Sequence, residues 1–148
     1  MAHMFVTLIY GVLDVRTGRV TLCNASHNPP YVARQNGSVE AVNGARALAL
    51  CLAGDFEYPD TALTLEPGDS LVLYTDGVTE AADKSGERFE DERLVACLEH
   101  VGQESPAEII RDVLRRLEAF SGGVPQADDI TLLALRYNGE TQADARKK

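Results

Sequence analysis

The sequence lacks the features that would place it in a membrane, a metal ribbon or a nucleic-acid complex. It has no apolar run of the ~20 residues that span a bilayer, and no signal-peptide pattern. Its three cysteines, Cys23, Cys51 and Cys97, form no CxxC pair, so free thiols in a reducing cytoplasm are predicted. The 14 Lys and Arg residues do not cluster and are outnumbered by 23 Asp and Glu. The resulting net charge of −9 argues against a nucleic-acid partner.

The composition is that of one globular domain. Apolar residues make up 45% and charged residues 25% of the 148 positions, with no internal repeat and no low-complexity linker. We interpret residues 1–3 as a cloning scar, 4–137 as the folded part and 138–148 as a polar tail. The apolar run 5–13 begins without any lead-in, which we interpret as a sign of truncation.

Strands are predicted in the first half of the chain and helices in the second. Turn signals at Gly18 and at Asn36-Gly37 predict two hairpins. Strands are expected at 5–14, 19–25, 30–33, 38–42, 58–65, 70–75 and 130–137. Apolar residues at helical spacing predict helices over 90–100 and 106–120, the second opened by a capping box. This order favours an α+β fold with mostly antiparallel layers and both helices on one face.

Acidic residues stand at the ends of two apolar strands. Asp76-Gly77 follows the strand 70–75, with Glu80 close behind, and Asp128-Asp129 precedes the strand 130–137. Carboxylates at strand ends can meet at one sheet edge, where Mg²⁺ or Mn²⁺ would find the oxygen ligands that they prefer. Taken alone, however, Asp-Gly is more typical of a turn and Asp-Asp of a solvated loop.

Longer strings resemble a known family. Residues 71–81, LVLYTDGVTEA, are similar to the strand-plus-TDGxTE signature of the stage-II-sporulation-E type of serine/threonine phosphatases, and residues 126–133, QADDITLL, to their DDIT signature. Further matches occur in the right order at 4–8, 24–30, 65–69 and 92–94. The resemblance covers 4–137, and it places the chain with the wider type-2C (PPM) metal-dependent phosphatases.

The resemblance implies a β-sandwich flanked by helices, with two Mn²⁺ or Mg²⁺ ions at one edge and direct attack of water on phosphoserine or phosphothreonine. It assigns metal-ligand roles to Asp76 and Asp128, with Gly77 letting the backbone pass close to the site. Asp129 takes the neighbouring place, behind the ligands or as an outer ligand. Glu80 matches a position that helps to hold a weaker third ion in some relatives.

His27 has two interpretations. In Ser26-His27-Asn28-Pro29-Pro30 it could act as a general acid near the leaving group. A histidine in such a loop is more often a structural hydrogen-bonding residue, and we favour that role.

The chain departs from the family pattern at several places. The GDxxGHG-like motif, which supplies the metal-bridging aspartate, is absent upstream of Phe5, so weak or no activity is expected from this chain. Ser26, Ala49 and Glu90 stand where the family usually has glycine.

Two functional hypotheses follow. The first is an enzyme that dephosphorylates a small regulatory protein of the anti-sigma-factor antagonist type in bacterial signalling. The second is a non-catalytic pseudophosphatase that binds the regulator. Retention of Asp76, Gly77, Asp128 and Asp129 favours the enzyme. We also expect homo-oligomers, formed through an exposed edge at the run 5–13.

Overall fold

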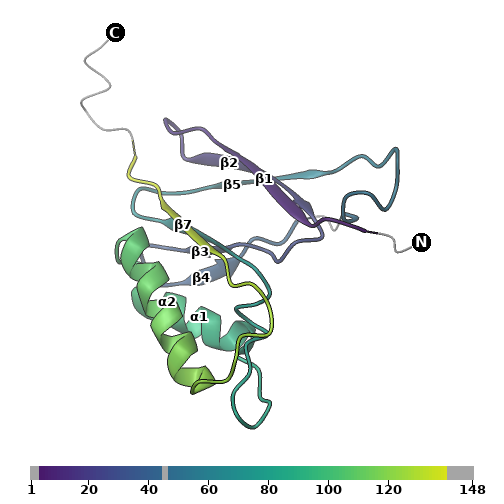
Figure 1. The fold of residues 1–148 in the computed structure, drawn as a ribbon. Helices are drawn as coiled ribbons and strands as arrows, with labels where there is room; N and C mark the ends of the chain where they lie inside the picture. Colours follow the sequence, from purple (N-terminus) through teal and green to yellow (C-terminus); the bar gives the residue numbers. More distant parts are fainter. Residues whose placement is uncertain (1–3, 45–46, 140–148) are drawn as a thin grey trace.

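The protein is built from two antiparallel sheets in layers, with two helices on the outer face of one of them (Figure 1). The computed structural model describes residues 4–44 and 47–139. The segment interpreted as a cloning scar, 1–3, and all but the first two residues of the polar tail lie outside the described residues. No helix in the described ranges is long and apolar enough to span a bilayer.

The first sheet has three strands in the order β1-β2-β5. β1 (Leu8–Leu13) and β2 (Arg19–Ala25) form the hairpin predicted around Gly18, which adopts a positive φ of 71°. β5 (Asp60–Thr64) pairs with β2 on the other side. β1 is therefore an edge strand of this sheet.

The second sheet has four strands in the order β4-β3-β6-β7. β3 (Tyr31–Ala33) and β4 (Val39–Ala41) form the second predicted hairpin, and β6 (Ser70–Tyr74) pairs with β3. β7 (Leu132–Arg136) pairs with β6 and is the other edge. Both hairpins were predicted because their turns contain a residue type that accepts positive φ.

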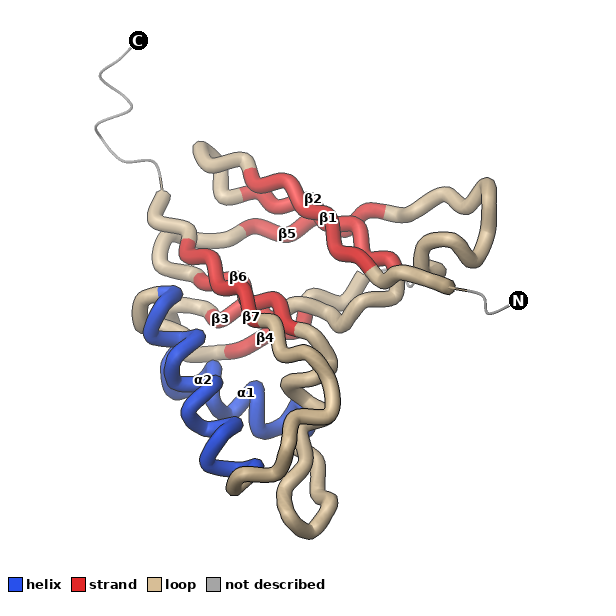
Figure 2. The backbone as a smooth tube through the Cα atoms, viewed as in Figure 1, coloured by secondary structure: helices blue, strands red, loops and turns tan. Residues whose placement is uncertain are grey.

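Both predicted helices are present and lie side by side under the four-stranded sheet (Figure 2). α1 spans Glu90–Val101 and α2 spans Pro106–Ser121. The capping box that opens α2 is formed, since Ser105 accepts from the amide of Glu108 and the Glu108 side chain accepts from the amide of Ser105. α2 ends where Gly122 turns left-handed.

Two hydrophobic cores result from this layering. One fills the space between the sheets and the other lies between the four-stranded sheet and the helices. β6 serves both cores, because Leu71 belongs to the first and Val72 and Tyr74 to the second. The predicted α+β fold with two antiparallel layers and helices on one face is thus confirmed.

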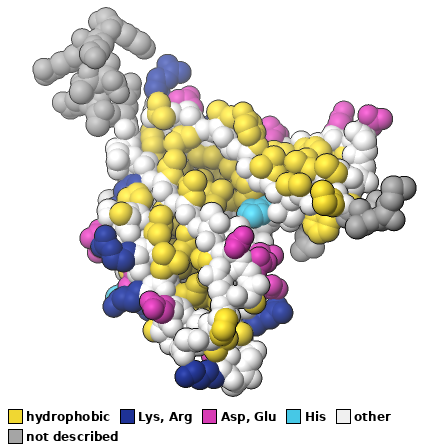
Figure 3. All heavy atoms as spheres, viewed as in Figure 1, with side chains coloured by type: hydrophobic (Ala, Val, Ile, Leu, Met, Phe, Trp, Pro, Cys, Tyr) yellow, Lys and Arg dark blue, Asp and Glu magenta, His cyan; other side chains and the backbone are white. Residues whose placement is uncertain are grey.

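The outward face of the three-stranded sheet carries exposed apolar side chains. Leu8, Tyr10 and Val12 alternate along β1 and are 45%, 64% and 55% exposed. Hydrophobic side chains gather over this strand in Figure 3. Ile9 and Leu13, on the opposite face, pack against the core between the sheets.

Candidate metal edge

The two acidic segments predicted to meet lie against each other at one end of the sandwich. Beyond the last paired residues of β6 and β7, the amide of Thr75 donates to the carbonyl of Thr131 at 3.1 Å. Asp76 follows Thr75 on one segment, and Asp128 and Asp129 precede Thr131 on the other. We call this place, residues 75–80 with 128–131, the acidic edge.

Gly77 lies close against the backbone of the other segment. A Cβ built on Gly77 would lie 2.5 Å from the carbonyl oxygen of Asp129 and 3.1 Å from that of Asp128. These neighbours are backbone atoms, which cannot swing away as a flexible side chain can. Only glycine therefore allows this packing, while the role predicted for Gly77 at a metal site stays a prediction.

Thr75 links the two segments through its side chain, a contribution that the sequence analysis did not anticipate. Its hydroxyl donates to the carbonyl of Asp129 at 2.7 Å and accepts from the amide of Thr131 at 2.9 Å. Gln126 adds a further bond by donating to the carbonyl of Asp128. The sequence did contain a signal for this role of Thr75, since Thr75 is a short polar residue that stands directly before Asp-Gly at the end of a strand.

The carboxylates at this edge are accessible to solvent. Asp76, Asp128 and Asp129 are all exposed, and one oxygen of Asp128 accepts from the amide of Asp129 at 2.7 Å. The carbonyl of Asp76 closes the loop that follows it, because it accepts from the Glu80 amide at 2.8 Å and from the Thr79 hydroxyl at 3.2 Å. These bonds fix the backbone and leave carboxylate oxygens free.

Glu80 is engaged elsewhere. Its carboxylate pairs with Arg88 at 2.8 Å, with both side chains about half exposed. An ion that used Glu80 as a ligand would have to compete with this guanidinium.

The oxygen donors of the acidic edge suit a hard divalent cation, but they form only part of a ligand set. Carboxylate and carbonyl oxygens are the ligands that Mg²⁺ and Mn²⁺ take. Across residues 4–44 and 47–139, however, no three acidic, histidine or cysteine side chains gather closely enough to form a metal site.

His27 lies in the loop that enters β3, and strand direction brings this loop to the same end of the sandwich. Tyr31 is paired with Val72 in an antiparallel register, so the residues before Tyr31 run toward the end of β6 from which Asp76 follows. The sequence alone could not show this, because it depends on which strands become neighbours.

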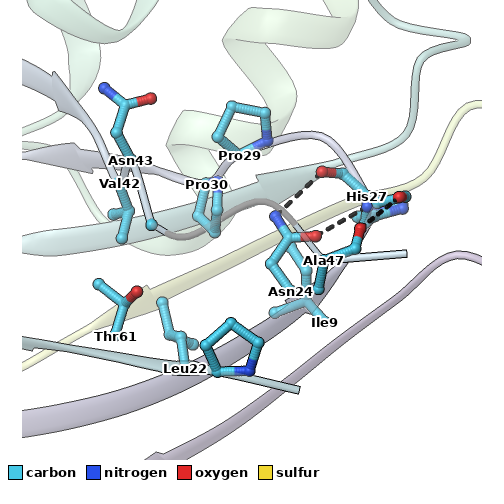
Figure 4. A pocket seen from close by; sticks show the side chains of 13 residues that line it. Ile9, Leu22, Asn24, His27, Pro29, Pro30, Val42, Asn43, Ala47 and Thr61 are labelled. Atoms are coloured by element: carbon cyan, nitrogen blue, oxygen red, sulfur yellow. Dashed lines mark hydrogen bonds between the residues drawn. The ribbon is translucent and has the colours of Figure 1, made fainter. Parts of the chain in front are cut away.

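The backbone of His27 is held in its loop by Asn24, and its ring contacts Thr7; the structural role of the ring stays a prediction. Its amide donates to the Asn24 side chain at 2.7 Å, and the Asn24 amide group donates to the His27 carbonyl at 2.9 Å. Nδ1 lies 3.0 Å from the Thr7 hydroxyl. His27 also lines a cavity of about 350 Å³ between the two sheets, drawn in Figure 4 with Asn24, Pro29 and Thr61.

Comparison with known proteins decides the family. The model of a family described as Stage II sporulation protein E (SpoIIE) matches residues 1–138. The chain belongs to the SpoIIE family. SpoIIE-type proteins are serine/threonine phosphatases of the PPM superfamily, whose activity depends on metal ions, generally Mn²⁺ or Mg²⁺.

Individual relatives agree with this assignment. The chain is 31% identical to the phosphoserine phosphatase RsbU of Bacillus subtilis over 139 residues, and 30% identical to protein IcfG of Synechocystis over 135. These matches cover 91% of this chain but 40% and 21% of the relatives, so the chain spans less than half of their length. Among solved structures, the SiaA-PP2C domain of Pseudomonas aeruginosa matches with a TM-score of 0.70 at 28% identity, covering 82% of this chain and 47% of that one.

Proposed function

We propose that residues 4–137 are part of a metal-dependent phosphatase domain that hydrolyses phosphoserine or phosphothreonine on a regulatory protein in bacterial signalling. The observation that carries the proposal is the contact of Gly77 with the backbone of Asp128 and Asp129 in a chain of the SpoIIE family. An anti-sigma-factor antagonist is the type of regulatory protein we expect as substrate.

In this proposal Asp76 and Asp128 hold Mn²⁺ or Mg²⁺, and Asp129 stabilises the neighbouring backbone or binds as an outer ligand. When bound, such an ion lowers the pKa of a coordinated water and supplies a hydroxide near neutral pH. The reaction is a hydrolysis, in which water oxygen bonds to phosphorus and the serine or threonine oxygen leaves. Thr75 and Gly77 keep the two ligand segments in register, and His27 holds the neighbouring loop.

The second candidate is a non-catalytic module that binds the phosphorylated regulator. Retention of Asp76, Gly77, Asp128 and Asp129 favours the enzyme over this module. Because the described residues supply only part of a ligand set, we expect this chain to bind Mn²⁺ weakly and to turn over phosphoprotein or p-nitrophenyl phosphate slowly or not at all.

Calorimetric titration with Mn²⁺ tests the proposal. Asp76→Asn and Asp128→Asn should each abolish the binding seen with the unaltered chain, whereas Asp55→Asn, in an exposed loop, should not change it. Equal Mn²⁺ affinity in all four proteins would rule out the acidic edge as the metal site. Hydrolysis of a phosphoserine peptide under saturating Mn²⁺, even if slow, that Asp76→Asn abolishes would rule out the non-catalytic module.

A further inference from the structure

An apolar groove of about 320 Å³ lies between the end of α2 and the loop that leads into β7. The last turns of α2 form one wall, the loop 123–127 forms another, and the segment that follows Glu80 forms the third. We call it the α2 groove; its apolar lining includes Ala81, Leu114, Leu117, Ala127 and Ile130.

The α2 groove is continuous with the acidic edge. Ala81 directly follows Glu80, and Ala127 directly precedes Asp128. Ile130 directly precedes Thr131, whose carbonyl accepts from the amide of Thr75, the residue before Asp76. The two segments that carry the candidate ligands therefore also form two walls of the groove.

The groove is open to an apolar occupant. Leu117, on its inner side, is only 3% exposed, whereas Leu114 at its lip is 41% exposed. A single exposed leucine is ordinary, but one at the lip of an apolar groove gains free energy when a second apolar side chain covers it. The volume is at the low end for ligand cavities, so it suits one or two side chains.

We propose that the α2 groove binds an apolar side chain that flanks the phosphorylated residue of the protein substrate. This inference rests on the proposed function, because the phosphate must lie at the acidic edge. Because Ala81 and Ala127 of the groove directly adjoin Glu80 and Asp128, the apolar side chain belongs to a residue close to the phosphoresidue in the substrate sequence.

Charge refines the expected partner. Glu118 lines the groove, the carboxylates of the acidic edge lie beside it, and the chain carries a net charge of −9. Acidic residues next to the phosphoresidue would be repelled, whereas a Lys or Arg beside the apolar residue would be attracted. The groove thus selects a flank that is apolar and basic.

Fluorescence anisotropy with labelled phosphoserine peptides in Mn²⁺ tests this inference. One peptide carries leucine at the flanking positions and the other carries serine there. Leu114→Lys should weaken binding of the leucine peptide about tenfold, which corresponds to ~1.4 kcal/mol, and leave the serine peptide unchanged. Leu48→Lys is the matched control, since Leu48 is 42% exposed and lies outside the groove.

The outcomes separate the groove from the metal site. If Leu114→Lys weakens binding of both peptides equally, or of neither, the groove does not bind the flanking side chain. Mn²⁺-dependent binding of the peptides would still support the proposed function in that case. If the unaltered chain binds neither peptide in Mn²⁺, both proposals fail. If Leu114→Lys instead removes self-association in sedimentation, the groove binds a second copy and the inference is wrong. If the lysine variant does not fold, Leu114→Ala replaces it in the test, because alanine keeps an apolar helix-forming residue. This variant should also weaken binding of the leucine peptide, by less than tenfold, and leave binding of the serine peptide unchanged.

Discussion

The hydroxyl of Thr75 donates to the carbonyl of Asp129 at 2.7 Å and so ties the segment after β6 to the segment before β7. Replacing Thr75 by Val keeps the β-branched shape and removes this bond and the one from the Thr131 amide. We expect a loss of about 1–2 kcal/mol in the free energy of unfolding and a severalfold weaker affinity for Mn²⁺. Urea unfolding and Mn²⁺ titration measure the two effects. Thr64→Val, at an exposed position in β5, should change neither.

Gly77→Ala tests the close approach itself. The added methyl would lie 2.5 Å from the Asp129 carbonyl oxygen, so the two backbone segments would have to separate. We expect a destabilisation of about 2–3 kcal/mol, together with loss of Mn²⁺ affinity. Gly54→Ala is the control, because nothing lies within 4 Å of the position of its added methyl. A Gly77→Ala protein as stable as the unaltered chain would show that the two segments are not held together.

Two of the three positions where the family usually has glycine carry a left-handed backbone. Ser26 has a φ of 57° and Glu90 a φ of 61°, a conformation that costs most side chains ~1–2 kcal/mol. Glu90→Gly should therefore be more stable than Glu90→Ala by about 1 kcal/mol in thermal or urea unfolding. Both variants lose the same charge at the start of α1, so their difference isolates the backbone effect. Higher stability of the alanine variant would contradict the assigned conformation.

Ser26→Gly should raise the free energy of unfolding by less than Glu90→Gly does. The Ser26 hydroxyl donates to the carbonyl of Ala47 at 2.6 Å, and glycine would lose that bond. The gain from relieved backbone strain and the loss of ~1 kcal/mol from the hydrogen bond should nearly cancel. Ser26→Ala, which loses the bond and keeps the strain, is expected to be clearly less stable than either protein in the same unfolding measurement.

Asp69 should make the stability depend on pH. Burial alone would raise the pKa of its carboxyl, but bonds from Arg34 at 2.9 Å and from the amides of Glu66 and Gln35 lower that pKa below its ordinary value of 3.8. Because the folded-state pKa is the lower one, the stabilisation is present above about pH 4 and is lost as the pH falls through the folded-state pKa. Asp69→Asn should cost about 3 kcal/mol at pH 7 and progressively less below pH 4. Urea unfolding between pH 3 and 7 measures the difference, with Asp55→Asn as the control.

The edge strand β1 should promote association between copies. Its outward face exposes Leu8, Tyr10 and Val12, and its backbone edge has no partner strand among the described residues. The net charge of −9 opposes contact, so association should increase with salt. Tyr10→Lys should reduce it, whereas Val15→Lys, at a turn position of similar exposure, should not. Light scattering that shows a monomer at both low and high salt would contradict this prediction.

Most of the fold could be predicted because local signals agreed with one another. The Gly18 and Asn36-Gly37 turns fixed two hairpins, and the capping box at Ser105 fixed the start of α2. The strand order could not be predicted, since β3 pairs with β6 across more than thirty residues of chain. Only that pairing brings the His27 loop to the end of the sandwich where the acidic edge lies. The contact of Gly77 with Asp129 could not be predicted either, since the family resemblance implied only that the backbone passes close to the site at Gly77.

The position of β6 between two cores has a consequence for hydrogen exchange. Its residues are buried on both sides, whereas those of β1 are mostly exposed. The amides of β6 should exchange only when the whole domain opens, and those of β1 through local fraying. Asp76 lies two residues after Tyr74, the last residue of β6, so the acidic edge adjoins the strand that we expect to open last among those described. Its geometry should therefore persist through fluctuations that release the three-stranded sheet.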